Sequence, residues 1–154
     1  MNYLSLNGIE TIFSQFVEAD PNLKQFGFGQ LYNQAGKPKV EQLYPGMWTQ
    51  LTTSTTVGDY ELNRSFQVII YDVPFDNHNK VISDCEEYAF RLIRFLRLHS
   101  DDFYLVGNPT ISPFTDKFLD DVCGVIVDIT ISTNMESSNC EDPVYNFNIK
   151  TNNI

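Results

Sequence analysis

The sequence predicts an α+β fold, in which an antiparallel sheet carries two helices packed on one of its faces. Apolar residues recur at helical spacing within residues 6–20 and 75–99, and they alternate with polar residues within 61–74 and 122–134. The stretches between them hold shorter strand patterns separated by turn residues. Because these strands follow one another in the chain, we expect an antiparallel sheet rather than a doubly wound parallel one.

Length and composition favour one globular domain with a short extension. The chain has 154 residues, of which 42% are hydrophobic and 14% aromatic, which is enough to bury a sizeable core. We expect the α+β domain to span residues 1–134 and the polar, Asn-rich residues 135–154 to form a C-terminal extension. The first residues show no signal-peptide pattern, and no stretch approaches the roughly 18 apolar residues that cross a bilayer. The sequence therefore predicts a soluble protein without membrane contact.

An amphipathic helix is predicted over residues 6–20. Asn7, followed three residues later by Glu10, fits a capping box at its start, and Pro21 ends it. Its apolar stripe consists of Leu6, Ile9, Ile12, Phe13, Phe16 and Val17.

Short strands and turns are predicted after this helix. In KQFGFGQLYNQ, aromatic residues up to Tyr32 nearly alternate, and the two glycines lack the third glycine and the following helix of a phosphate loop. Glycines beside aromatic residues in a strand are typical of a bulge or of close backbone packing. A second short strand is predicted over Val40–Tyr44, and Trp48 just after it is expected to be a core residue or an anchor for a partner.

Residues 51–61, LTTSTTVGDYE, are polar and carry no apolar stripe. They predict either a long loop or a polar strand. A polar strand of this kind would contribute little to a core but would suit an arm that pairs with a neighbouring chain.

The second half of the chain holds the strongest strand and helix patterns. In the strand over 61–74, one face is predicted to carry Tyr60, Leu62, Phe66, Val68 and Ile70, and the other Asn63, Ser65, Gln67 and Tyr71, with only Ile69 breaking the polar side. Asp76 or Asn77 is expected to cap the helix that follows. Its apolar stripe is Val81, Ile82, Cys85, Tyr88, Ala89, Leu92, Ile93 and Leu96.

The strand over 122–134 is predicted to turn Cys123, Val125, Val127, Ile129 and Ile131 inward. Before it, Pro109 and Pro113 interrupt residues 101–121, so strands there are expected at an edge or broken by turns.

No residue pattern indicates catalysis. His78 and His99 lie at opposite ends of one predicted helix, about 30 Å apart at 1.5 Å per residue, so they cannot share a metal or form a dyad. DNHN at 76–79 lacks the spacing of a calcium loop, and adjacent acidic pairs point apart. Cys85, Cys123 and Cys140 are odd in number and are expected to be reduced thiols. We expect no enzyme activity, no cofactor and no metal.

The charge of the chain argues against recognition of nucleic acid. The formal net charge is −10, whereas phosphate binding needs clustered Lys and Arg. Arg91, Arg94 and Arg97 recur at helical spacing, and we interpret them as a solvated helix face.

The C-terminal extension contains an alternating apolar pattern, Tyr145, Phe147 and Ile149. We expect residues 143–150 to lie against another subunit or another protein, with these side chains as anchors. The alternative is that the segment folds back on its own domain.

The order of elements resembles that of a known family. LYPGMWTQL, the strand ending FQVIIYDVP, the helix ending RLIRFLRLH and the final PTISPFTDKFLDDVCGVIVDITIST are similar in arrangement to the tail terminator and tail-completion proteins of tailed bacteriophages, including head–tail ring proteins of crAss-like phages. The resemblance covers about residues 4 to 133 and rests on patterns of strand, turn and helix.

The resemblance implies a tail-terminator-like structural virion protein. It would be made in the bacterial host cytoplasm and form a ring, hexamer or larger, at the head–tail connector or tail end. Other virion proteins would contact the ring, and genomic DNA would pass through it without specific binding. Asp59 and Glu61 are the candidates for residues that face the DNA passage. The alternative is a small, non-enzymatic α+β ligand-binding or regulatory domain.

Overall fold

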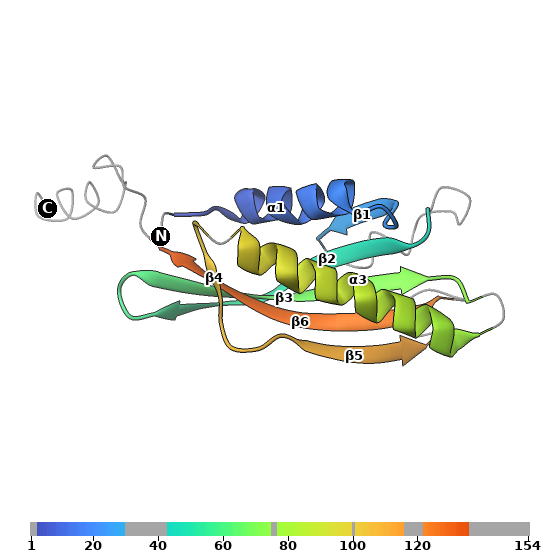
Figure 1. The fold of residues 1–154 in the computed structure, drawn as a ribbon. Coiled ribbons are helices and arrows are strands. Elements are labelled where there is room, and N and C mark those ends of the chain that lie inside the picture. Colours follow the sequence, from blue (N-terminus) through green and yellow to red (C-terminus); the bar gives the residue numbers. More distant parts are fainter. Residues whose placement is uncertain (1–2, 30–42, 75–76, 100, 116–121, 136–154) are drawn as a thin grey trace, which may run out of the picture.

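The two helices of the described residues lie over the same face of one mixed sheet (Figure 1). The computed structural model describes residues 3–29, 43–74, 77–99, 101–115 and 122–135. The predicted α+β architecture, with two helices on one face, is confirmed. In chain order the elements are α1 (Leu6–Ala19), β1 (Gln25–Phe28), β2 (Gly46–Val57), β3 (Glu61–Asp72), α3 (His78–Leu98), β4 (Tyr104–Leu105), β5 (Thr110–Thr115) and β6 (Cys123–Asn134).

The sheet is built around β3. Its strand order is β1-β2-β3-β6-β4, and β5 also pairs with β6. The β3–β6 ladder is antiparallel along its whole length, from Glu61 opposite Asn134 to Asp72 opposite Cys123. β1 runs parallel to β2, so the expectation of a fully antiparallel sheet is wrong for this strand. A long connection separates the two strands, and parallel neighbours require such a connection instead of a tight hairpin.

The face under the helices holds the main core. Phe66, Val68 and Ile70 of β3 pack there with β6 residues and with the buried stripe of α3, as predicted. Phe13 of α1 meets Phe66 edge to face, with ring centroids 5.6 Å apart. The fully enclosed members from β6 and α3 are Val125, Val127, Ile129, Ile131, Cys85, Ala89, Leu92 and Leu96.

The opposite face of the sheet has a second, smaller apolar cluster. It consists of Trp48, Ile69, Tyr71, Phe114, Val122 and Ile126. This cluster explains why Ile69 interrupts the polar side of its strand. Tyr71 was predicted to lie on a polar face but is only 2% exposed, because it belongs to the same cluster. Tyr60, predicted to point inward, is 65% exposed because it lies in the turn after β2.

The helix caps agree only in part with those predicted from the sequence. Asn77 caps α3 as predicted, since its side chain accepts hydrogen bonds from the backbone N–H groups of Asn79 and Lys80. The capping box at Asn7 is wrong. Ser5 is the N-cap of α1, and its Oγ accepts a hydrogen bond from Gly8 N at 3.1 Å, so Asn7 already lies inside the first turn.

The polar stretch after Trp48 is a strand and not a loop. β2 extends to Val57 and forms a long hairpin with β3 around a turn at residues 58–60, where Gly58 has φ +62°. The strand predicted over Val40–Tyr44 is wrong where the structure describes it, because Leu43 to Pro45 are not in a strand and β2 begins at Gly46. The rest of that range, and Tyr32, lie outside the described residues.

The edge strands near the C-terminus behave as predicted. β4 and β5 are short and both pair with β6. Pro113 lies within β5, where it can be accommodated because no further strand of the described residues pairs with β5.

Replacing Leu92 by Ala should lower the free energy of unfolding by roughly 2 to 5 kcal/mol, because this side chain is fully buried between α3 and the sheet. Urea denaturation would measure the change. Glu87→Ala on the exposed side of α3 is the matched control and should change stability by less than about 0.5 kcal/mol. Equal effects of the two substitutions would contradict the orientation of α3.

Candidate interaction surfaces

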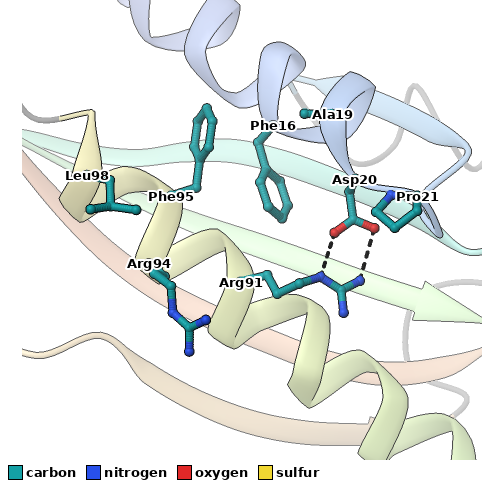
Figure 2. A pocket seen from close by; sticks show the side chains of 8 residues that line it. All are labelled: Phe16, Ala19, Asp20, Pro21, Arg91, Arg94, Phe95 and Leu98. Carbon is teal, nitrogen blue, oxygen red and sulfur yellow. Dashed lines mark hydrogen bonds and ion pairs between the residues drawn. The ribbon is translucent and has the colours of Figure 1, made fainter.

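A two-point ion pair joins the end of α1 to the middle of α3. Arg91 donates from Nε to Asp20 Oδ2 at 2.8 Å and from Nη2 to Asp20 Oδ1 at 3.0 Å (Figure 2). Asp20 is also the C-cap of α1, and its Oδ1 accepts hydrogen bonds from the backbone N–H groups of Asn22 and Leu23. The Asp20 carboxylate therefore stabilises the turn that follows α1 and holds α3 through Arg91.

The Arg91 contact determines the protonation of Asp20. Burial alone would raise the pKa of this carboxyl, but the hydrogen bonds from Arg91 and from the two backbone N–H groups outweigh it, so the pKa lies below its ordinary value. The same hydrogen bond raises the pKa of Arg91. The pair is thus charged on both sides at neutral pH.

A shallow apolar groove lies beside this ion pair, between the C-terminal parts of both helices. Its volume is about 280 Å³. Figure 2 shows Phe16 of α1 and Phe95 of α3 lying side by side, with Leu98 at the end of the groove away from the ion pair. Their ring centroids are 5.5 Å apart. The lining residues are Phe16, Ala19, Asp20, Pro21, Arg91, Arg94, Phe95 and Leu98.

A second hollow of about 430 Å³ lies on the other side of α3. It is more polar than the first, and it is bounded by α3 and by the segment from Asn108 to Ile111. Arg94 and Leu98 line both hollows. In Figure 2 the Arg94 side chain points away from α1, toward this second side.

The β2–β3 hairpin presents a long free strand edge. β1 pairs with β2 only from Gly46 to Thr49, and no other strand of the described residues pairs with β2 on that side. Residues 52–57 are exposed and uncharged. An edge of this kind offers unpaired backbone N–H and C=O groups to another strand.

Trp48 is held inside its own chain. It is 5% exposed, and its Nε1 donates a hydrogen bond to Gly29 O at 3.0 Å. Gly27 lies directly against the indole, since a Cβ there would come within 1.9 Å of Trp48 Cε3. The close-packing interpretation of this glycine is correct. Trp48 thus offers almost no surface to a partner, which contradicts its use as a partner anchor and leaves it as a core residue.

Of the other residues singled out from the sequence, the structure describes Asp59 and Glu61. Asp59 is exposed in the hairpin turn, and Glu61 begins β3 and accepts a hydrogen bond from Tyr104 at 3.0 Å. The two lie close together in the chain, and whether they face a passage stays a prediction. Tyr145, Phe147 and Ile149 lie outside the described residues.

Two arginine roles were not recognised in the sequence. Arg91 was assigned to a solvated face with Arg94 and Arg97, but it pairs with Asp20. Arg64, on the helix side of β3, is 7% exposed and donates from Nη1 to Leu4 O at 2.8 Å. The apolar–polar alternation of β3 places position 64 on the inner face of the strand. The sequence therefore did contain a signal that Arg64 is buried. The Asp20–Arg91 contact joins residues far apart in sequence and left no local signal.

The chemistry of the described residues is sparse. They contain no group of three or more His, Cys, Asp and Glu side chains that could hold a metal ion. Cys85 and Cys123 are buried thiols, and burial raises the pKa of Cys85, so this thiol stays protonated. Among the helices described, none is long and apolar enough to pass through a membrane.

Comparison with known proteins gives no assignment. No model of a known protein family matches the chain, and a search of curated proteins finds no match.

Replacing Asp20 by Asn should lower the free energy of unfolding at pH 7 by roughly 1 to 3 kcal/mol. This loss is smaller than for a fully buried pair, because the Arg91 side chain is 35% exposed.

Because the folded-state pKa of Asp20 is lowered, its stabilisation is present at neutral pH and is lost as the pH falls below about 4. Urea denaturation at both pH values should therefore show that the free energy of unfolding falls less between pH 7 and pH 3 in the variant than in the wild type. Asp59→Asn in the exposed turn is the control, and equal acid sensitivity of Asp20→Asn and wild type would contradict this account.

Proposed function

We propose that this protein is a non-enzymatic assembly subunit that forms an oligomeric ring, hexamer or larger, in the virion of a tailed bacteriophage. The ring would lie at the head–tail connector or the tail end and join neighbouring virion proteins. The observation that carries the assembly role is the free, uncharged outer edge of β2. The resemblance of the sequence, in its order of strand, turn and helix patterns, to tail terminators supports the placement in a virion.

The β2 edge suits pairing with a neighbouring copy. Sheet proteins that remain monomeric protect such edges with Lys, Pro, bulges or short strands. The outer part of β2, QLTTSTTV, has neither Lys nor Pro, although a register shift occurs between Leu51 and Thr53. The β5 edge is the weaker candidate, because Pro113 removes one backbone donor. A head-to-tail contact through the β2 edge closes into a ring if its rotation permits.

The charge of the subunit suits a ring through which DNA moves without being held. A net charge of −10 per subunit repels phosphate, and Asp59 and Glu61 at the hairpin end are the side chains that we expect at the passage.

A second candidate function is that of a small ligand-binding or regulatory domain. The apolar groove between α1 and α3 favours it. Its volume of about 280 Å³ is just below the usual range of small-molecule sites, and the groove is shallow, so we rank this function second.

Placing Lys at Ser54 and Thr56 should prevent assembly, because charged side chains on the β2 edge oppose strand addition. Light scattering coupled to gel filtration should show a hexamer or larger for the wild type and a monomer for the variant. The control Gln15→Lys with Glu18→Gln adds the same two charge units on exposed positions of α1 and should assemble normally. A wild-type chain that is monomeric at high concentration would contradict the ring and favour the ligand-binding domain.

Reversing the charges at the hairpin end should create DNA binding. Asp59→Lys with Glu61→Lys is expected to strengthen duplex binding by the assembled protein by about tenfold or more at moderate salt, because each subunit changes the potential of the passage. Fluorescence anisotropy with a labelled duplex measures this, and Glu18→Lys with Glu87→Lys, which adds the same four charge units at exposed helix positions, is the control. Tight duplex binding by the wild type would exclude a passage that repels DNA.

A further inference from the structure

The second hollow, between α3 and the segment from Asn108 to Ile111, is basic in an acidic chain. Arg94 and Arg97 line it from α3, and none of the described residues that line it is acidic. The whole sequence, by contrast, has 20 acidic and 10 basic residues. The volume of the hollow, about 430 Å³, lies within the usual range of small-molecule sites, so its charge and its size together fit a small anion.

The guanidinium of Arg94 is available to such an anion. Figure 2 shows this side chain pointing away from α1, toward the side of α3 on which the second hollow lies. Arg91, three residues earlier, is held by Asp20, whereas Arg94 forms no ion pair within the part of the chain that the structure describes. A carboxylate that pairs with Arg94 therefore has to come from outside this part of the chain.

Apolar side chains form the floor of the hollow. Ile93 and Ile111 line it from α3 and β5, and both pack against the main core. Phe90, which is 52% exposed, extends this apolar surface along α3. Because burial of apolar surface is favourable, a ligand that covers these side chains gains affinity with the area that it removes from water.

We propose that the second hollow binds a small monocarboxylate with a hydrocarbon body, of the size of a short fatty acid. The carboxylate accepts hydrogen bonds from the planar Arg94 guanidinium, whose N–H groups match the two carboxylate oxygens. The hydrocarbon body lies on Ile93 and Ile111, and the exposed amide of Asn108, on the wall opposite α3, donates a further hydrogen bond. The site belongs to one chain, so it goes beyond the proposed assembly and does not depend on it.

The combination of charge and apolar surface disfavours other classes of ligand. An inorganic anion such as phosphate would pair with Arg94 but would leave Ile93 and Ile111 uncovered. A neutral hydrocarbon would cover the isoleucines but leave Arg94 unpaired, and a cation would be repelled by Arg94 and Arg97. Because a single ion pair contributes little at an exposed site, binding needs both the charge and the apolar surface.

Methyl NMR of the full-length protein tests the site directly. The δ1 methyl groups of isoleucine would be labelled with ¹³C, and the variants Ile93→Val and Ile111→Val would assign the two signals. Titration with hexanoate should shift both signals in a saturable way. 1-Hexanol has the same hydrocarbon chain without the charge and should bind about fivefold more weakly, since an exposed charge pair contributes about that much. Hexylammonium, which carries the opposite charge, should not bind.

Arg94→Gln is the matched variant. It removes the charge but keeps most of the side chain, and it should weaken hexanoate binding about fivefold without changing the binding of 1-hexanol. The control Lys80→Gln removes one positive charge from an exposed position in the first turn of α3, away from the hollow, and should leave hexanoate binding unchanged. Both positions are exposed, so neither substitution should disturb the fold.

Two kinds of result would contradict the site. Hexanoate that shifts neither isoleucine signal would show that the hollow binds no carboxylate of this class. Equal affinities for hexanoate and 1-hexanol, or equal effects of Arg94→Gln and Lys80→Gln, would show that Arg94 does not recognise the charge. Light scattering on the same samples separates this inference from the proposed function. A ring that binds no hexanoate would refute the site alone, and a monomer that binds hexanoate as expected would support the site and refute the ring.

Discussion

The ladder between β3 and β6 is the constraint on which the rest of the fold depends. It is continuous over both strands, and its residues contribute to apolar clusters on both faces of the sheet. The helix-side cluster fixes α1 and α3 above the ladder, and the smaller cluster fixes Trp48 and Phe114 below it. Gly124 permits this pairing, because a Cβ at that position would come within 1.9 Å of Ile70 O, a backbone atom that cannot move aside.

The ladder also explains why the hairpin projects. β3 stays paired with β6 up to Glu61, so β2 remains attached to the sheet well beyond the point where β1 ends. The outer part of β2 is therefore held in the sheet and exposed without burying apolar side chains of its own. An ordered polar edge of this kind is costly for a monomer because it invites association, and it becomes useful in an assembly.

Sequence patterns predicted the core of this fold but missed contacts between residues that are far apart in the sequence. The alternation around Phe66 and Val127 and the helical stripe through Leu92 specified which faces are buried, because periodicity directly reports one-sided burial. The parallel pairing of β1, the second cluster around Tyr71 and the Asp20–Arg91 pair depend on which segments meet in space, and local pattern does not encode this. Trp48 illustrates the limit for sites, since an aromatic residue beside a turn has the same sequence signature whether it is a core residue or an anchor for a partner.

Hydrogen exchange of the β2 backbone tests most directly the claim that this protein assembles through its hairpin. Exchange would be followed by mass spectrometry at protein concentrations below and above assembly. Amides in residues 50–57 should become protected by about tenfold or more on assembly, because a neighbouring strand would pair with the free edge, whereas β4 should change little. Assembled protein in which residues 50–57 exchange as fast as in the dilute chain would contradict the account.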